Sequence, residues 1–176
     1  MNVALPRKIA AALLIALASA IAGISSYYVV VTLRSLDDLL LCAIGKDSLV
    51  PKPLCLAYIL QRDLDAPERD ALNAGIGATW AVSSGIQTDR EKLLRHLLAQ
   101  GIDINAANRR HGFTALHRAM LENDADAVTL LLKYGADRSV RDTRRGLTAL
   151  EWAQREQGKP GQPDRSRIIG LLNPRR

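Results

Sequence analysis

Two stretches of the chain, NRRHGFTALHRA (residues 108–119) and DTRRGLTALEWA (142–153), carry one pattern at an offset of 34 residues. The glycine, threonine, leucine and first and last alanines of the first stretch all return in the second, so that Gly112, for example, pairs with Gly146. A period of this length indicates a repeat architecture, in which each unit packs only on its neighbours. Aromatic residues make up only 4% of the chain, which suits thin layers of small and aliphatic side chains.

Residues 108–141 form the most complete unit and read NRRHGFTALHRAMLENDADAVTLLLKYGADRSVR. Thr114 stands where its side chain can cap a first helix by accepting a backbone N–H. Leu131 and Leu132 belong to the apolar stripe of a second helix. Gly135 follows that helix, where a left-handed residue commonly ends it. The unit is therefore predicted to be a turn followed by two antiparallel helices.

This unit resembles the ankyrin repeat, through Gly112-x-Thr114-x-Leu116-His117 at its start and Val128-x-x-Leu131-Leu132-x-x-Gly135-Ala136-Asp137 at its end. The resemblance implies stacked helix pairs with hairpin fingers, and binding of other proteins through the finger tips and the exposed edge of the first helix. The chain departs from the family pattern at Ala115 and Ala149, where proline is preferred, at Asn123, where glycine is usual, and at Glu151, where histidine is usual. We expect a divergent stack.

A single unit cannot bury both of its faces, so neighbouring units are expected. Upstream, EKLLRHLLAQGIDINAAN (91–108) repeats the second-helix ending at the same offset, with its first helix predicted over 77–85. Downstream, a third unit opens at 144–156 and its second helix returns at an offset of 40. The Gly/Pro loop GKPGQP (158–163) accounts for that insertion. The repeats are therefore predicted over 74–176.

The N-terminal part contains a long apolar run. After Arg7 and Lys8, residues 9–33 hold 25 positions without a charged side chain, which is long enough to span a bilayer with some tilt. The alternative is a cleavable signal peptide with Ala18-Ser19-Ala20 as its site, although the apolar run continues past that point. The excess of basic residues before the run favours a cytoplasmic N-terminus. The Ala/Arg-rich, Lys-poor composition suggests a bacterium, which would place the repeats in the periplasm.

Residues 34–73 predict a helical hairpin that Pro51 and Pro53 interrupt. Such a hairpin would bring Cys42 and Cys55, the two cysteines of the chain, close together. In an oxidising compartment they could form a disulfide, whereas the alternative is a pair of buried free thiols. Two thiols without further ligands fall short of a zinc site, so no metal is expected.

The partner-binding surface implied by the resemblance consists of finger tips and exposed helix-one positions. On this sequence these are Arg109, Arg110, His111, Phe113, Leu121, Glu122, Arg144, Arg145, Leu147, Arg155 and Glu156. The two arginine pairs would line one edge and suggest a protein partner with an acidic surface. Residues 108–176 hold 14 Lys/Arg against 8 Asp/Glu, so the net charge of +6 is concentrated there. The alternative is that these charged fingers are merely solvated.

The remaining polar and aromatic residues favour structural roles. His117 is expected to form hydrogen bonds within and between units, and Trp80 and Trp152 to pack in the core. The chain has no H-E-x-x-H, G-x-S-x-G or P-loop motif, so neither an enzyme nor a cofactor is expected. Nucleic acid is not the expected partner either, because the basic residues lack an aromatic stacking platform.

The sequence thus predicts an all-α protein with a membrane anchor or signal peptide over 1–33, a helical hairpin over 34–73 and ankyrin repeats over 74–176. The predicted function is binding of a partner protein at the periplasmic face of a bacterial inner membrane. One specific form is an immunity protein that neutralises a secreted envelope-targeting toxin, such as a lipase. The alternatives are a scaffold of a membrane or redox complex and a cytosolic, membrane-tethered adaptor.

Overall fold

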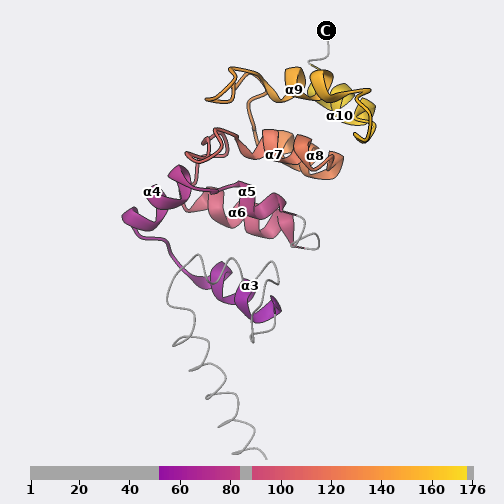
Figure 1. Cartoon of the computed structure of the whole chain (residues 1–176). Coiled ribbons are helices and arrows are strands. Elements are labelled where there is room, and N and C mark those ends of the chain that lie inside the picture. The colour runs from indigo at the N-terminus through magenta and orange to yellow at the C-terminus, as the bar shows by residue number, and fades with distance from the viewer. Residues whose placement is uncertain (1–51, 84–88, 174–176) are drawn as a thin grey trace, which may run out of the picture.

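A computed structural model describes residues 52–83 and 89–173 (Figure 1). These residues form helices and connecting turns, without a strand among them. The helices are α3 (Lys52–Gln61), α4 (Ala66–Ala74), α5 (Thr79–Val82), α6 (Arg90–Ala99), α7 (Ala115–Leu121), α8 (Ala125–Lys133), α9 (Ala149–Glu156) and α10 (Ser166–Leu172). None of these described helices has the length and apolar character that crossing a membrane requires. The predicted anchor at 9–33 and the first arm of the predicted hairpin lie outside the described residues.

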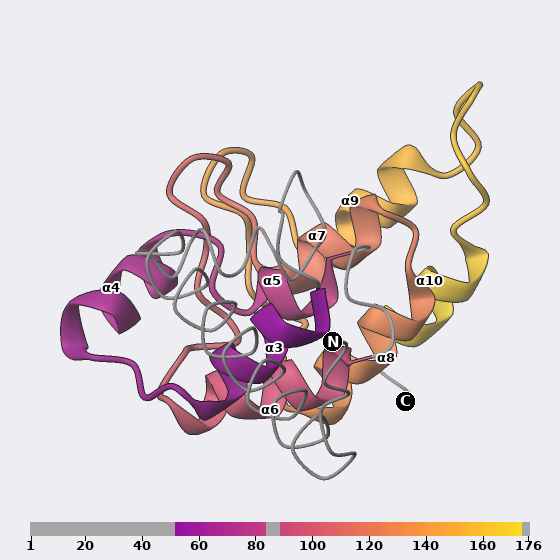
Figure 2. The same cartoon turned by 90° about the horizontal axis from the view of Figure 1, so that it is seen from below.

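Three helix pairs, α5/α6, α7/α8 and α9/α10, are stacked one above another, and α3 lies below the first pair (Figure 1). Along the stack, α7 contacts both α5 and α9, so the first helix of each unit packs on the next. Seen from below, the pairs lie over one another and the fingers project from one side (Figure 2). A continuous core runs through the layers, with Leu93, Leu97, Ala119 and Leu131 almost fully buried. Helices α6 and α8 lie 35 residues apart at their starts and α7 and α9 lie 34 apart, close to the predicted period.

The predicted helix boundaries have clear local causes. Thr114 caps α7 by accepting a hydrogen bond from a backbone N–H in the first turn. Thr148 caps α9 in the same way, and Glu151 completes a capping box there. Gly135 has φ 87° just after α8, and Asn123 takes φ 55° in the turn before it. The caps form although alanine, not proline, begins both first helices.

Helix α4 occupies the C-terminal end of the segment 34–73 that the sequence predicts to be a helical hairpin, so the prediction missed it as a separate helix. Its start carries a capping box in which Asp65 and Glu68 each accept a backbone hydrogen bond. Pro67 stands in its first turn, where a proline is tolerated because the N–H has no helical partner. These signals are visible in the letters DAPE (65–68), which mark a helix start.

The last helix begins one residue later than the predicted offset of 40 would place it. Asp124 precedes α8 as its N-cap and Arg165 precedes α10, which gives an offset of 41. The buried residues Leu131 and Leu172 show the same offset. Val128 and Ile168 are both buried and keep the predicted offset of 40, so α10 lies within one residue of its predicted place.

The outer face of the third unit is polar. His117 and Met120 are buried where the second unit packs against the third. One period later these positions hold Glu151 and Gln154, and Gln154 is exposed. A polar outer face of this kind is typical of the capping unit of a repeat stack.

Candidate functional site

The fingers of the second and third units end in turns that are built alike. In the second unit, Asn108 Oδ1 accepts hydrogen bonds from the backbone N–H of Arg110 at 2.7 Å and of His111 at 3.0 Å. Gly112 closes this turn by donating its N–H to the Asn108 carbonyl at 2.6 Å. One period later Asp142 replaces the asparagine. We call residues 108–112 and 142–146, together with Arg138, the finger edge.

Asp142 ties the third finger to the helices behind it. The carboxylate is only 2% exposed and accepts the N–H groups of Arg144, Arg145 and Leu147 at 2.6–3.0 Å. It also accepts the indole N–H of Trp152 at 2.8 Å. Burial raises the pKa of this carboxyl, but the four hydrogen bonds outweigh burial and lower the pKa to about 2. The charged form is therefore part of the fold.

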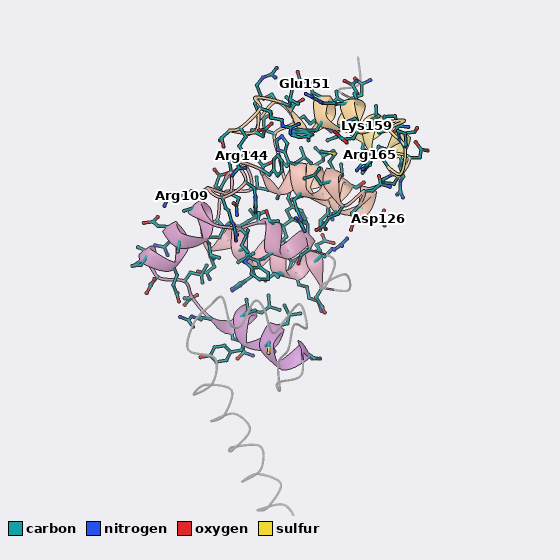
Figure 3. All side chains as sticks on the ribbon, in the orientation of Figure 1. Arg109, Asp126, Arg144, Glu151, Lys159 and Arg165 are labelled. Carbon is teal, nitrogen blue, oxygen red and sulfur yellow. The ribbon has the colours of Figure 1, made fainter. Side chains whose placement is uncertain are left out.

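The two finger tips are joined to each other. The Thr143 N–H donates to the Gly112 carbonyl at 3.1 Å, and the Arg144 guanidinium donates to the Arg110 carbonyl. Gly112 has φ 74°, and a Cβ atom there would lie 2.3 Å from Thr143 Oγ1. Only glycine fits this contact without displacing the neighbouring finger. Arg109 and Arg144 accordingly lie along one side of the stack (Figure 3).

Helix α4 takes the place of a finger at the N-terminal end of this edge. The Asp137 N–H donates to Asn105 Oδ1 of the preceding finger at 2.9 Å. The Asp103 N–H makes the matching bond, at 2.8 Å, to Asn73 Oδ1 in α4. The C-terminal end of α4 therefore supplies the acceptor that an earlier finger would otherwise supply.

The arginines of this region divide into two groups. Arg145 covers the Trp152 ring at 4.8 Å, and Arg141 pairs with Glu151 at 2.8 Å. All of these arginines are exposed, but in the second group the guanidinium groups contact no carboxylate in residues 52–83 and 89–173. Its members are Arg109, Arg110, Arg138 and Arg144. Arg138 was missed from the sequence, because the preceding unit has Ile104 at that position.

Phe113 packs between units rather than standing free at the tip. Its half-buried ring stacks on His117 at 5.7 Å and meets Trp152 edge-on at 5.6 Å. His117 bonds to Thr114 Oγ1 through Nδ1 and donates from Nε2 to the Leu147 carbonyl of the next unit, both at 2.9 Å. Burial lowers the pKa of His117, which favours the neutral ring that these bonds require. The bridging role predicted for His117 is confirmed.

The predicted site residues do not all gather at the finger edge. Leu121 and Glu122 lie at the C-terminal end of α7, and Arg155 and Glu156 at that of α9, away from the fingers. Because a helix of seven residues rises about 10 Å, its two ends cannot share one small contact. Leu121 packs against the core, and Glu122 forms an ion pair with Arg118 at 2.6 Å. Leu147 is half-buried near the finger base.

The edge of the stack opposite the fingers holds an open groove, which is lined by residues 122–126, Asp164, Arg167 and Ile168. Its carboxylates are largely paired, Asp124 with Arg90 at 2.6 Å and Asp126 with Arg167 at 2.9 Å. Within the part of the chain that the structure describes, no group of three or more potential metal ligands occurs.

Trp80 and Trp152 are buried in the stack, as predicted. Cys55 is fully buried in α3, and its sulfur is not a free thiol. Because Cys42 lies outside the described residues, the bridge between the two cysteines stays a prediction.

Comparison with known proteins identifies the stack. Residues 79–163 match the family described as ankyrin repeats, in three copies. The E3 ubiquitin-protein ligase KEG of Arabidopsis thaliana is 31% identical over 108 residues, which are 53% of this chain and 7% of that protein. Ankyrin repeat domain-containing protein 40 of Homo sapiens is 33% identical over 63 residues, 36% of this chain and 17% of that protein. The inhibitor of Bruton tyrosine kinase of Homo sapiens is 31% identical over 67 residues, 38% of this chain and 5% of that protein. The chain spans less than a fifth of each relative.

Proposed function

Because residues 79–163 are ankyrin repeats, which imply protein–protein interaction, we propose that the chain binds its partner protein through the finger edge. The observation that carries this proposal is the group of exposed arginines whose guanidinium groups contact no carboxylate within residues 52–83 and 89–173. The Asn108 turn holds the backbone of Arg110 and the Asp142 turn holds that of Arg144, so these positive charges are presented by ordered loops. An interface arranged in this way favours a partner surface rich in carboxylates.

Exposed charges of this kind attract a partner mainly at short range. They mainly affect the rate at which the partner associates. At about 0.15 M salt the Debye length is roughly 8 Å, so the arginines attract a partner only as it approaches contact. The partner therefore needs its acidic groups at the docking surface itself. Binding should weaken as salt is added, since exposed ion pairs are screened.

We also propose that residues 9–33 anchor the chain in a bacterial inner membrane, with the repeats in the periplasm. The 25-residue uncharged run and the basic residues before it support this proposal. In that compartment a small anchored binder fits an immunity protein, which would capture a secreted envelope-targeting toxin such as a lipase. The mechanism would be occlusion of the toxin's active site or of its membrane-docking surface.

The finger edge is tested with the double variant Arg110→Glu/Arg144→Glu and the matched control Arg95→Glu, an exposed reversal on α6. The probe is the product of a neighbouring gene that proves toxic to the cell envelope, and affinity is measured at low and at physiological salt. We expect the double variant to weaken binding about tenfold and to flatten the salt dependence, since exposed pairs contribute about 0.2–1 kcal/mol each. Unchanged affinity with an intact circular dichroism spectrum would refute the role of the finger edge.

Protection of cells from the toxin tests the immunity role separately. The same double variant should lose protection together with affinity, and the Arg95→Glu chain should keep both. If binding falls while protection persists, the chain does not act by capturing that toxin. The scaffold alternative predicts instead a stoichiometric membrane complex under ordinary growth.

Thiol labelling of intact cells tests the compartment. The periplasmic proposal predicts a disulfide between Cys42 and Cys55 that a reagent reaches only after permeabilisation of the outer envelope and reduction. Free thiols that stay shielded until the inner membrane is broken would favour the cytosolic adaptor.

A further inference from the structure

The finger edge continues into α4, and the sign of its charge changes along the way. The Arg109 N–H donates to the Ala74 carbonyl at the end of α4, at 3.1 Å, so the helix and the second finger are in direct contact. Figures 1 and 2 show α4 on the same side of the stack as the fingers. Exposed arginines therefore occupy one end of a single side, and α4 occupies the other.

The exposed charges of α4 and the turn before it are acidic. Asp63, Asp65 and Asp70 are all exposed. Asp65 caps the helix and Asp63 accepts the amide of Gln100 at 3.1 Å, so both carboxylates are held in place. Asp70 has no hydrogen bond or ion pair with any residue in the described ranges.

The basic residues of the same segment do not cancel this charge at the surface. Arg62 forms an ion pair with Glu68 inside the segment, and both are partly buried. Arg69 is also partly buried and donates to the Leu64 carbonyl at 2.6 Å. Asp103 and Asp137 are also exposed among the fingers, but the four exposed arginines of the finger edge outnumber them. The side of the stack is therefore bipolar, acidic along α4 and basic along the fingers.

We propose that the partner of the finger edge carries an acidic patch followed by a basic patch, and docks in one direction only. The acidic patch lies on the finger arginines and the basic patch on the α4 carboxylates. Docking in the reverse direction places like charges against each other at both ends, and such juxtaposition selects against wrong orientations. This inference rests on the proposed function. It adds α4 to the interface and specifies the order of the acidic and basic patches on the partner.

The test uses the full chain and labelled synthetic peptides at low salt, followed by fluorescence anisotropy. The probes are a short oligo-glutamate, a two-block peptide of glutamates, a glycine spacer and lysines, and a peptide of the same composition with alternating charges. The variants are Asp70→Lys, its matched control Asp126→Lys on the opposite edge, and Arg110→Glu/Arg144→Glu. Asp126 is exposed and has only a solvent-exposed ion pair to lose.

We expect the two-block peptide to bind roughly threefold more tightly than either of the other peptides, because the second block adds exposed charge pairs. Asp70→Lys should remove that gain without weakening oligo-glutamate binding, whereas Asp126→Lys should change neither. The arginine double variant should weaken the binding of the two-block peptide and of oligo-glutamate.

Three results would overturn the inference. If the two-block peptide binds no more tightly than oligo-glutamate, the partner needs only an acidic patch. The inference about α4 then fails, and the proposed function is unaffected. If oligo-glutamate does not bind, or binds independently of the arginines, the proposed function itself fails. If sedimentation shows a dimer that Asp70→Lys dissociates, a second copy of the chain occupies this side instead.

Discussion

Replacing Asp142 by alanine should lower the free energy of unfolding by about 3 kcal/mol. The carboxylate accepts four hydrogen bonds and is 2% exposed. Two of the donors belong to the exposed residues Arg144 and Arg145, whose N–H groups can bond to water instead. The indole N–H of Trp152 is enclosed, and an enclosed donor without a partner costs about 1–3 kcal/mol.

Two matched variants separate charge from geometry. Asp142→Asn keeps an acceptor for the tip, but its amide group would face the N–H of Leu147 or of Trp152, so we expect a loss of about 2 kcal/mol. Asn108→Ala removes the equivalent side chain of the second finger, whose two donors are exposed, and should cost only about 1 kcal/mol. The expected order of destabilisation is therefore Asp142→Ala, then Asp142→Asn, then Asn108→Ala.

Urea unfolding at neutral pH, followed by circular dichroism and tryptophan fluorescence, measures this order. The pH dependence gives a second measurement. The pKa of Asp142 is about 2 in the fold, below the ordinary value of 3.8, so its contribution is present above pH 4 and is lost as pH falls towards 2. Asp142→Asn should lack this contribution. An Asp142→Ala chain within about 0.5 kcal/mol of the parent would refute the reasoning.

Three further changes probe the stack. Gly112→Ala should destabilise more than Gly146→Ala, because both residues have positive φ but only the Gly112 Cβ would collide with Thr143; equal melting temperatures would contradict this. His117→Ala should lower the free energy of unfolding by about 2 kcal/mol. It should also reduce the loss of stability below about pH 6.5, because burial lowers the pKa of the ring in the fold and the unfolded chain therefore binds the proton more readily; an unchanged pH profile of unfolding would contradict it. Leu131→Asp should abolish the helical circular dichroism signal, because the site is fully buried and an unpaired charge there exceeds the margin of a small domain; a cooperative melt would contradict it.

The features that the sequence predicted are those with local causes. Thr114 and Gly135 mark helix ends by their own chemistry, and the 34-residue period returns the threonine at Thr148 and the glycine at Gly101. The bridge from His117 to the next unit follows from the resemblance of TALH to the ankyrin motif and not from the period, because Glu151 holds the equivalent position one period later.

What could not be predicted depends on contacts across units. The sequence does not reveal that Arg145 covers the Trp152 ring while Arg110 contacts no ring or carboxylate among the described residues, although the two belong to matching arginine pairs. Nor does it show that Asn73 substitutes for a finger residue, because the contact to Asp103 spans 30 positions and has no periodic partner upstream. Asp142 could have been found, since Asn108 occupies its place one period earlier.

The joined finger tips have a thermodynamic consequence. A loop that is mobile in the free protein loses conformational entropy when a partner holds it, and that loss reduces affinity. Here the contact between Gly112 and Thr143 and the bond from Arg144 to Arg110 restrict both loops while the chain folds. The backbone of the tips therefore has little disorder left to lose on association, and only the ends of the arginine side chains remain to be immobilised.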